Sequence, residues 1–208
     1  MFSLQTMFGK GDKFYGLLEA SAQAARDGAS ALQSLLEHRG GAPLDGFRAA
    51  RRREKQLAAQ ISEALVNTFV TALDREDIEA MSSALYRIPK TIQKFADRYA
   101  IVSDRLQDVD FASRAALLMR ATDAVAQMVG ELRNGLRINA MKEMQERLQA
   151  IESEADRMLL DSYRNLYTAG GDPIRVMAAK DLFELLEKAI DRCRDVGNVI
   201  YSIVLKNS

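Results

Sequence analysis

Acidic side chains recur near the end of the chain at the spacing of one helix face. The row consists of Glu184, Glu187, Asp191 and Asp195. At about 100° per residue these positions fall on one stripe. Glu152 and Asp156 have the same spacing as Glu187 and Asp191. Because carboxylate oxygens are the ligands of hard cations, two such pairs on adjacent helices predict a metal site, with Asp195 extending it.

A bland interpretation of the same acids stays open. Carboxylates four residues apart on a helix repel each other by a few tenths of a kcal/mol, so a row of them favours a nearby counter-charge. Lys188, Arg192 and Arg194 are close enough in sequence to supply it. The row would then be an ordinary solvated face.

The remaining residue types argue against other chemistry. A single His makes a Ser-His-Asp triad improbable, and a single Cys rules out an internal disulfide framework. We expect His38 to cap or border a helix and Cys193 to lie in the core. Lysine plus arginine and aspartate plus glutamate both number 29, which gives no argument for nucleic-acid binding. No apolar run reaches the length of a membrane span or a secretory signal, so we expect a cytoplasmic protein.

The elements that must position the acids are helices. Apolar residues recur at i, i+3, i+4 and i+7, which predicts helices over about 13–37, 45–72, 74–99, 108–134, 138–167 and from 172 almost to the C-terminus. Asp74, with Asp77 three residues later, is the expected N-cap of the third helix, and Asp172-Pro173 that of the last. Short connections favour antiparallel neighbours. The fold class is therefore all-α, with three long helices in each half of the chain.

The last helix also has a clear apolar face opposite its acids. This face consists of Leu182, Leu185, Leu186, Ala189, Cys193, Val196, Ile200 and Ile203. We expect it to pack into the core, which turns the acidic row outward.

Three segments resemble the PhoU-like family of the Pit-accessory type. They are GKGDKFYGLLEASA, DREDIEAMSSAL after TFVTAL, and the C-terminal AIDRC-DV-NVI-SIVLKN pattern. The resemblance implies a tandem of two antiparallel three-helix bundles, here 1–104 and 105–208. It also implies a role in phosphate uptake beside a Pit-type transporter, and metal clusters held by Glu/Asp-x-x-x-Asp motifs, two in each repeat.

By this resemblance only the second repeat keeps its acidic motifs. Glu152, Asp156, Glu187 and Asp191 stand where the metal ligands of the family belong, with Asp195 extending the second motif and Glu154 and Glu184 as auxiliary ligands. The corresponding first-repeat positions are Arg51, Lys55, Tyr86 and Lys90, and one offset of 101 residues relates all four pairs. We therefore expect at most one metal cluster, of iron, manganese, zinc or magnesium.

The cations of the first repeat suggest a different chemistry. Arg51, Lys55 and Lys90 would form a basic patch beside Arg52 and Arg53. Guanidinium and ammonium groups suit phosphate or carboxylate oxygens, so we hypothesise an anion site or a docking surface for an acidic partner. The alternative is a solvated basic face paired with Glu54 and Asp97.

The sequence thus predicts a PhoU-like regulator of inorganic phosphate transport without an activity of its own. It would contact a Pit-type transporter from the cytoplasmic side, peripheral to the inner membrane, and whether it is a homodimer stays open. The first alternative is a helical scaffold or interaction protein that has lost metal binding. The second is a hydrolase with a metal-bound water, which lacks a visible general base.

Overall fold

Long helices make up nearly all of the chain. The computed structural model describes residues 4–37, 44–135, 137–169 and 171–207, with backbone alone for 4–12 and 169. These residues contain helices but no strand, which confirms the all-α prediction. The helices are α1 (Leu4–Glu37), α2 (Asp45–Val66), α3 (Arg75–Val102), α4 (Ala112–Glu131), α5 (Ile138–Ala169) and α6 (Pro173–Lys206), with 3₁₀ turns at Ser103–Arg105 and Leu132–Asn134.

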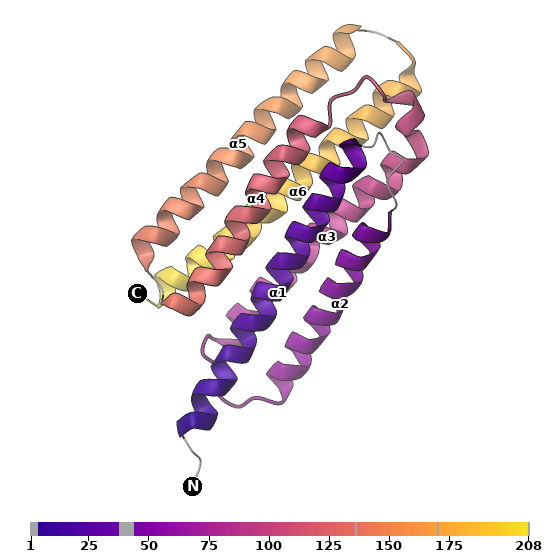
Figure 1. The fold of residues 1–208 in the computed structure, drawn as a ribbon. Coiled ribbons are helices and arrows are strands. Elements are labelled where there is room, and N and C mark those ends of the chain that lie inside the picture. Colours follow the sequence, from indigo (N-terminus) through magenta and orange to yellow (C-terminus); the bar gives the residue numbers. More distant parts are fainter. Residues whose placement is uncertain (1–3, 38–43, 136, 170, 208) are drawn as a thin grey trace.

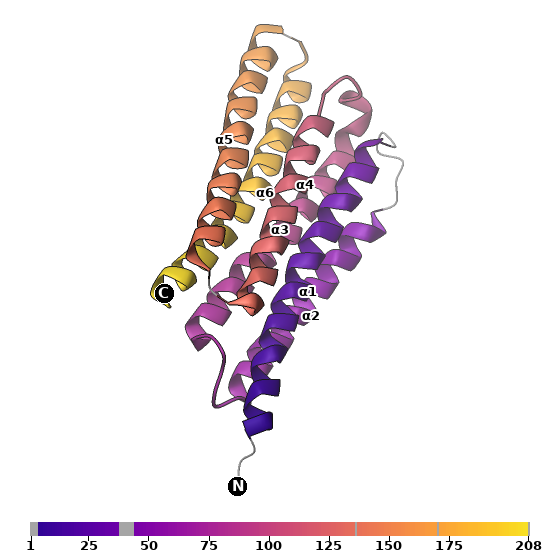
Figure 2. The ribbon, with the colours of Figure 1, turned by 60° about the vertical axis from the view of Figure 1, so that its left-hand side comes forward.

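The helices lie side by side along a common direction (Figures 1 and 2). In the first half α1, α2 and α3 pack against one another, and in the second half α4, α5 and α6 do the same. The halves meet where α1 packs on α4 and α3 packs on α6. Helices α2 and α5 are left on the two outer sides, so α2–α3 and α5–α6 form equivalent pairs in the two halves (Figure 1).

The apolar faces of the helices form one core that continues through both halves. On α6 the entire predicted apolar face is buried, and Cys193 within it is fully inaccessible. Burial raises the pKa of the Cys193 thiol far above its usual range, which keeps it a neutral core side chain.

Aromatic rings join the two halves. Phe95 and Tyr99 of α3 stack with centroids 5.7 Å apart, and Phe111 packs edge-on against both at 5.6 and 5.8 Å. The Phe111 ring also lies 4.9 Å from that of Phe183 on α6. Such pairs each add about 0.5–1.5 kcal/mol beyond their burial, so these rings favour a fixed arrangement of the halves.

The predicted boundary between 104 and 105 falls inside the 3₁₀ turn that follows α3. The turn connects two helix triplets that share one core. Whether 1–104 and 105–208 are separate folding units stays a prediction.

The second helix ends earlier than predicted. It stops at Val66 instead of running to residue 72, and the Asn67 side chain bonds to the Glu63 carbonyl at 3.0 Å. Arg75 then fastens the following segment, because its guanidinium donates to the carbonyls of Leu65 and Thr68. Phe69 in this segment is fully exposed.

Other helix ends give mixed outcomes. Asp172 caps α6 as predicted, accepting from the Ile174 N–H at 3.1 Å, with Pro173 at the first position. Asp74 is the N-cap residue of α3 as predicted, but its carboxylate makes no capping bond and instead pairs with Lys206. Helix α4 begins at Ala112, four residues late, because Asp110 accepts from the N–H of Ser113.

Three further helix ends differ from the prediction. Helix α1 begins nine residues before the predicted position 13, and α3 and α5 run a few residues beyond theirs. His38 and the 40–43 break lie outside the described residues.

Candidate functional site

The predicted acids of the second repeat do come together, on the facing sides of α5 and α6. Glu152 and Asp156 come from α5, and Glu187 and Asp191 from α6. The two helices pack along their length, which places these four positions opposite each other. The arrangement follows from the helix periodicity once α5 and α6 are neighbours.

Glu187 is the most strongly perturbed member of this acidic cluster. Its pKa is raised to about 7, first because it is half-buried and then because Asp191, Asp156 and Glu152 are close to it. The outward face expected from the sequence is therefore only half exposed at this residue. Four carboxylates this close together repel one another, and a nearby cation reduces that repulsion.

The structure supplies that cation from within the chain. The Arg194 guanidinium bridges the two helices, with Nη1 at 2.7 Å from Glu152 and Nη2 at 2.8 Å from Asp191. The Glu152 side chain is only 13% exposed, so its bond to Arg194 is partly shielded from water. The sequence left open whether these acids bind a metal or pair with cations of the chain. In this structure Glu152 and Asp191 pair with Arg194.

The neighbouring acids are also paired with cations. Asp195 lies 2.6 Å from Arg192, and Glu154 lies 3.1 Å from Arg120. Glu184 accepts from Lys180 and from the Tyr163 hydroxyl, which hold its pKa below the usual range. Each of the three predicted extending or auxiliary ligands thus has a partner.

The donor set of the acidic cluster is right for a hard cation, but the arrangement is not open to one. Within the described ranges no three His, Cys, Asp or Glu side chains are grouped so that they could hold a metal ion. Glu152 and Asp191 point their oxygens at Arg194. A metal would fit only after this guanidinium has moved away.

The first half of the chain carries a group of opposite charge on α2 and α3, at the positions that the offset of 101 residues relates to the acids. The Arg51 guanidinium lies 3.9 Å above the Tyr86 ring centroid and donates to the Tyr86 hydroxyl. The Lys90 ammonium lies 5.9 Å from the same centroid. The Tyr86 pKa is lowered by the bond from Arg51 and by the charges of Arg51, Lys90 and Lys55. We call these four residues the basic cluster.

Glu54 lies beneath the basic cluster and was not predicted as a site residue. Its side chain is fully buried, and in the described part of the chain neither carboxyl oxygen has a hydrogen-bond partner. Burial raises the pKa of Glu54 to about 7. The neighbouring Ser21 hydroxyl and the positive charge of Arg51 lower this pKa by smaller amounts. Glu54 is therefore not the surface partner of a basic face.

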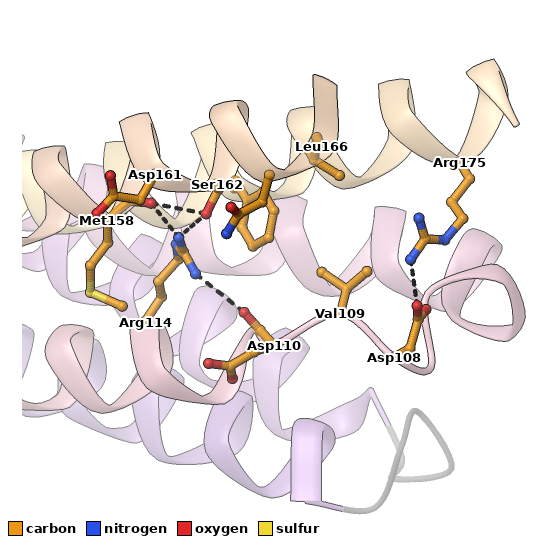
Figure 3. A pocket seen from close by; sticks show the side chains of 11 residues that line it. Asp108, Val109, Asp110, Arg114, Met158, Asp161, Ser162, Leu166 and Arg175 are labelled. Carbon is orange, nitrogen blue, oxygen red and sulfur yellow. Dashed lines mark hydrogen bonds and ion pairs between the residues drawn. The ribbon is translucent and has the colours of Figure 1, made fainter. Parts of the chain in front are cut away.

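A pocket of about 400 Å³ opens beside the start of α4 (Figure 3), and no residue of either cluster lines it. Arg114, only 7% exposed, reaches across it to the Met158 carbonyl at 2.6 Å and to the Ser162 hydroxyl of α5. Its guanidinium also lies 4.2 Å from the Phe183 ring centroid. Arg175 and Asp108 also line the pocket and pair with each other at 2.6 Å.

The sequence does contain a signal for Arg114. It lies three and four positions before Leu117 and Leu118, which puts it on the buried face of α4. A cation on an apolar face indicates a buried structural bond. Arg114 ties α4 to α5 through neutral acceptors, and burial lowers its pKa.

Comparisons with known proteins agree with this architecture. No family model matches the chain. It is 24% identical over 207 residues to a protein of Rhizobium meliloti (strain 1021) named "Putative pit accessory protein", covering 94% of each. It is also 24% identical to UPF0111 protein YkaA of Bacillus subtilis (strain 168), covering 69% of this chain and 70% of that protein.

Two solved structures share the fold. A PhoU-like protein from Shewanella oneidensis MR-1 superposes with a TM-score of 0.81 at 17% identity, covering 92% of this chain and 96% of that one. A second protein from the same organism, named "putative PhoU-like phosphate regulatory protein", has a TM-score of 0.78 at 19% identity, covering 93% and 99%. The chain therefore has the fold of the PhoU-like proteins and is similar along its length to a protein named as a pit accessory protein.

Proposed function

We propose that this protein is an accessory regulator of inorganic phosphate transport that acts by contact with a Pit-type transporter. The observation that carries the proposal is the similarity along 94% of the chain to a protein named as a pit accessory protein. The PhoU-like fold supports the same role. No helix in the described ranges is long and apolar enough to cross a membrane. The contact that we propose is peripheral, from the cytoplasmic side.

The segment between α2 and α3 is the best candidate for this contact. Phe69 and Val70 lie there with 100% and 61% of their surfaces exposed, and Val66 at the end of α2 is 81% exposed. Arg75 fixes the backbone that presents them, through the carbonyls of Leu65 and Thr68. Large apolar side chains held out in water by a fixed backbone favour a protein partner.

A direct test uses the transporter in proteoliposomes. The purified chain is mixed with vesicles that contain a Pit-type transporter from the same source, and with empty vesicles of the same lipids. The proposal expects cosedimentation with the transporter vesicles alone. Equal sedimentation with both, or with neither, would contradict it.

The metal part of the proposal concerns the acidic cluster. A metal held by Glu152, Asp156, Glu187 and Asp191, with Asp195 beside them, would link the protein to metal status once Arg194 had moved. Elemental analysis of protein purified without chelator tests this. The experiment compares wild type, Arg194→Gln, and the variant with all four first-named acids changed to Ala.

The expected result is metal in the wild type, at least as much in Arg194→Gln, and none in the four-fold variant. Arg194→Gln removes a competing cation and keeps the carboxylates, so it can only favour metal. Absence of metal from all three after reconstitution with Mn²⁺, Fe²⁺ and Zn²⁺ would contradict it. The non-catalytic scaffold would then be the better account.

A further inference from the structure

The basic cluster combines cations from two helices around one phenol. Arg51 and Lys55 come from α2, and Tyr86 and Lys90 come from α3. Arg51 contacts the Tyr86 ring and hydroxyl, Lys90 faces the same ring, and Lys55 is near enough to lower the Tyr86 pKa. Three positive charges, from Arg51, Lys55 and Lys90, thus lie near the side chain of Tyr86.

Among the described residues, no ion pair neutralises these three cations. In the part of the chain that the structure describes, Arg51, Lys55 and Lys90 make no ion pair, whereas the nearby Arg48 and Arg53 pair with Asp45 and Asp27. Lys55 and Lys90 are exposed, so their ammonium groups are accessible from solvent. Unneutralised cations at close range repel each other, and an anion between them relieves that repulsion.

The buried acid Glu54 does not fill this role. Glu54 is fully buried, with Ser21 of α1 beside it and Arg51 above it. Burial keeps its pKa near 7, so it carries only part of a charge at neutral pH. Its carboxyl group faces the core and leaves the outer side of the cluster positive.

Tyr86 adds a directional donor to the charges. Its oxygen accepts from Arg51, which leaves its own O–H proton to donate elsewhere. Two ammonium groups and one phenol O–H make a donor set that matches the oxygens of a phosphate group. The equivalent second-repeat positions hold carboxylates and would repel the same ligand.

We infer that the basic cluster binds a phosphate group, with Lys55, Lys90 and Tyr86 contacting its oxygens and Arg51 holding Tyr86 in place. The ligand class is a tetrahedral oxyanion, and free inorganic phosphate is the expected source. That source rests on the proposed function. Titration of the chain with inorganic phosphate involves no transporter. Phosphate binding and the contact with a transporter can therefore be refuted separately.

The test is calorimetric titration of the full chain with inorganic phosphate. A matched pair of double variants separates a site from general charge. Lys55→Gln/Lys90→Gln removes two cluster charges, and Arg52→Gln/Arg87→Gln removes two exposed charges from the same helices outside the cluster. We expect one phosphate per chain, at least tenfold weaker binding in the first variant and less than threefold change in the second.

Tyr86→Phe provides a second, milder change. It keeps the ring beneath Arg51 and removes only the hydroxyl, so we expect binding to weaken several-fold with thermal stability unchanged. Equal weakening in both double variants, or no phosphate binding by the wild type at millimolar concentration, would overturn the inference.

A vesicle arm distinguishes the source of the phosphate group. The chain is sedimented with phosphatidylcholine vesicles with and without phosphatidic acid. Sedimentation that depends on phosphatidic acid and is lost in Lys55→Gln/Lys90→Gln would support a lipid phosphate as the ligand of the same site. Absence of sedimentation, together with calorimetric binding, supports free phosphate.

Discussion

At the scale of single residues, the two halves of the chain carry clusters of opposite charge. Two of the four carboxylates on α5 and α6 pair with Arg194, while three cations on α2 and α3 lie near Tyr86. The positions are related by one offset in sequence. Each cluster thus has its own central side chain of complementary chemistry.

Glu54 gives a residue-scale prediction about pH. Its folded pKa of about 7 lies above the ordinary value of 4.5, so burial disfavours its ionised form. The free energy of unfolding is therefore highest below pH 4.5, where Glu54 is neutral in both states. It falls as the pH rises from 4.5 through 7. Glu54→Gln should therefore be more stable than wild type at pH 8 by roughly 2–3 kcal/mol, and by much less at pH 5.

Urea unfolding of both proteins at the two pH values checks this prediction. Both keep Glu187, whose pKa is also about 7, so the difference between them isolates Glu54. A variant that is less stable than wild type at pH 8 would mean that Glu54 is ionised and paired in the fold.

At the scale of elements, close packing of α5 on α6 depends on Gly197. A Cβ at this position would lie 2.5 Å from Gln145 Oε1 and 2.7 Å from Leu148 Cδ1, both on α5. In contrast, a Cβ on Gly130 of α4 would meet nothing within 4 Å. The two glycines therefore have different reasons to be present.

Alanine at these positions should act in opposite directions. Gly197→Ala forces two α5 side chains to move and should destabilise the protein by about 1–3 kcal/mol. Gly130→Ala removes backbone freedom from an open helix position and should stabilise it by about 0.5–1 kcal/mol. Thermal unfolding of both variants measures this, and similar shifts in both would refute the packing argument.

The helices and their buried faces were predictable because they depend on local periodicity. The α6 stripe with Cys193 is an example. The end of α2 could not be predicted in this way, because it depends on a bond from Arg75 of the next helix to the Thr68 carbonyl. The Arg194 bridge likewise requires knowledge that α5 and α6 face each other. Glu54 was missed because its charge suggested a surface, although Ala50, Leu57 and Ile61 share its face.

At the scale of the whole molecule, the shared core holds the acidic and basic clusters in fixed positions. The segment between α2 and α3 exposes apolar side chains on the same molecule. Phe69→Ser should abolish cosedimentation with transporter vesicles, because it removes the most exposed apolar side chain of that segment. Ile101→Ser is the control, an 82% exposed residue near the end of α3. Neither variant should change the melting temperature by more than a few degrees. Equal loss of sedimentation in both would point to general surface hydrophobicity.

Phosphate uptake tests the central claim most directly. The initial rate of radiolabelled phosphate entry is measured in cells in which a Pit-type transporter is the one phosphate importer, with and without this chain. The account predicts that removal of the chain changes the rate and that wild-type protein restores it, while Phe69→Ser does not. An uptake rate that is the same with and without the chain, at both low and high phosphate, would contradict an accessory role in phosphate transport.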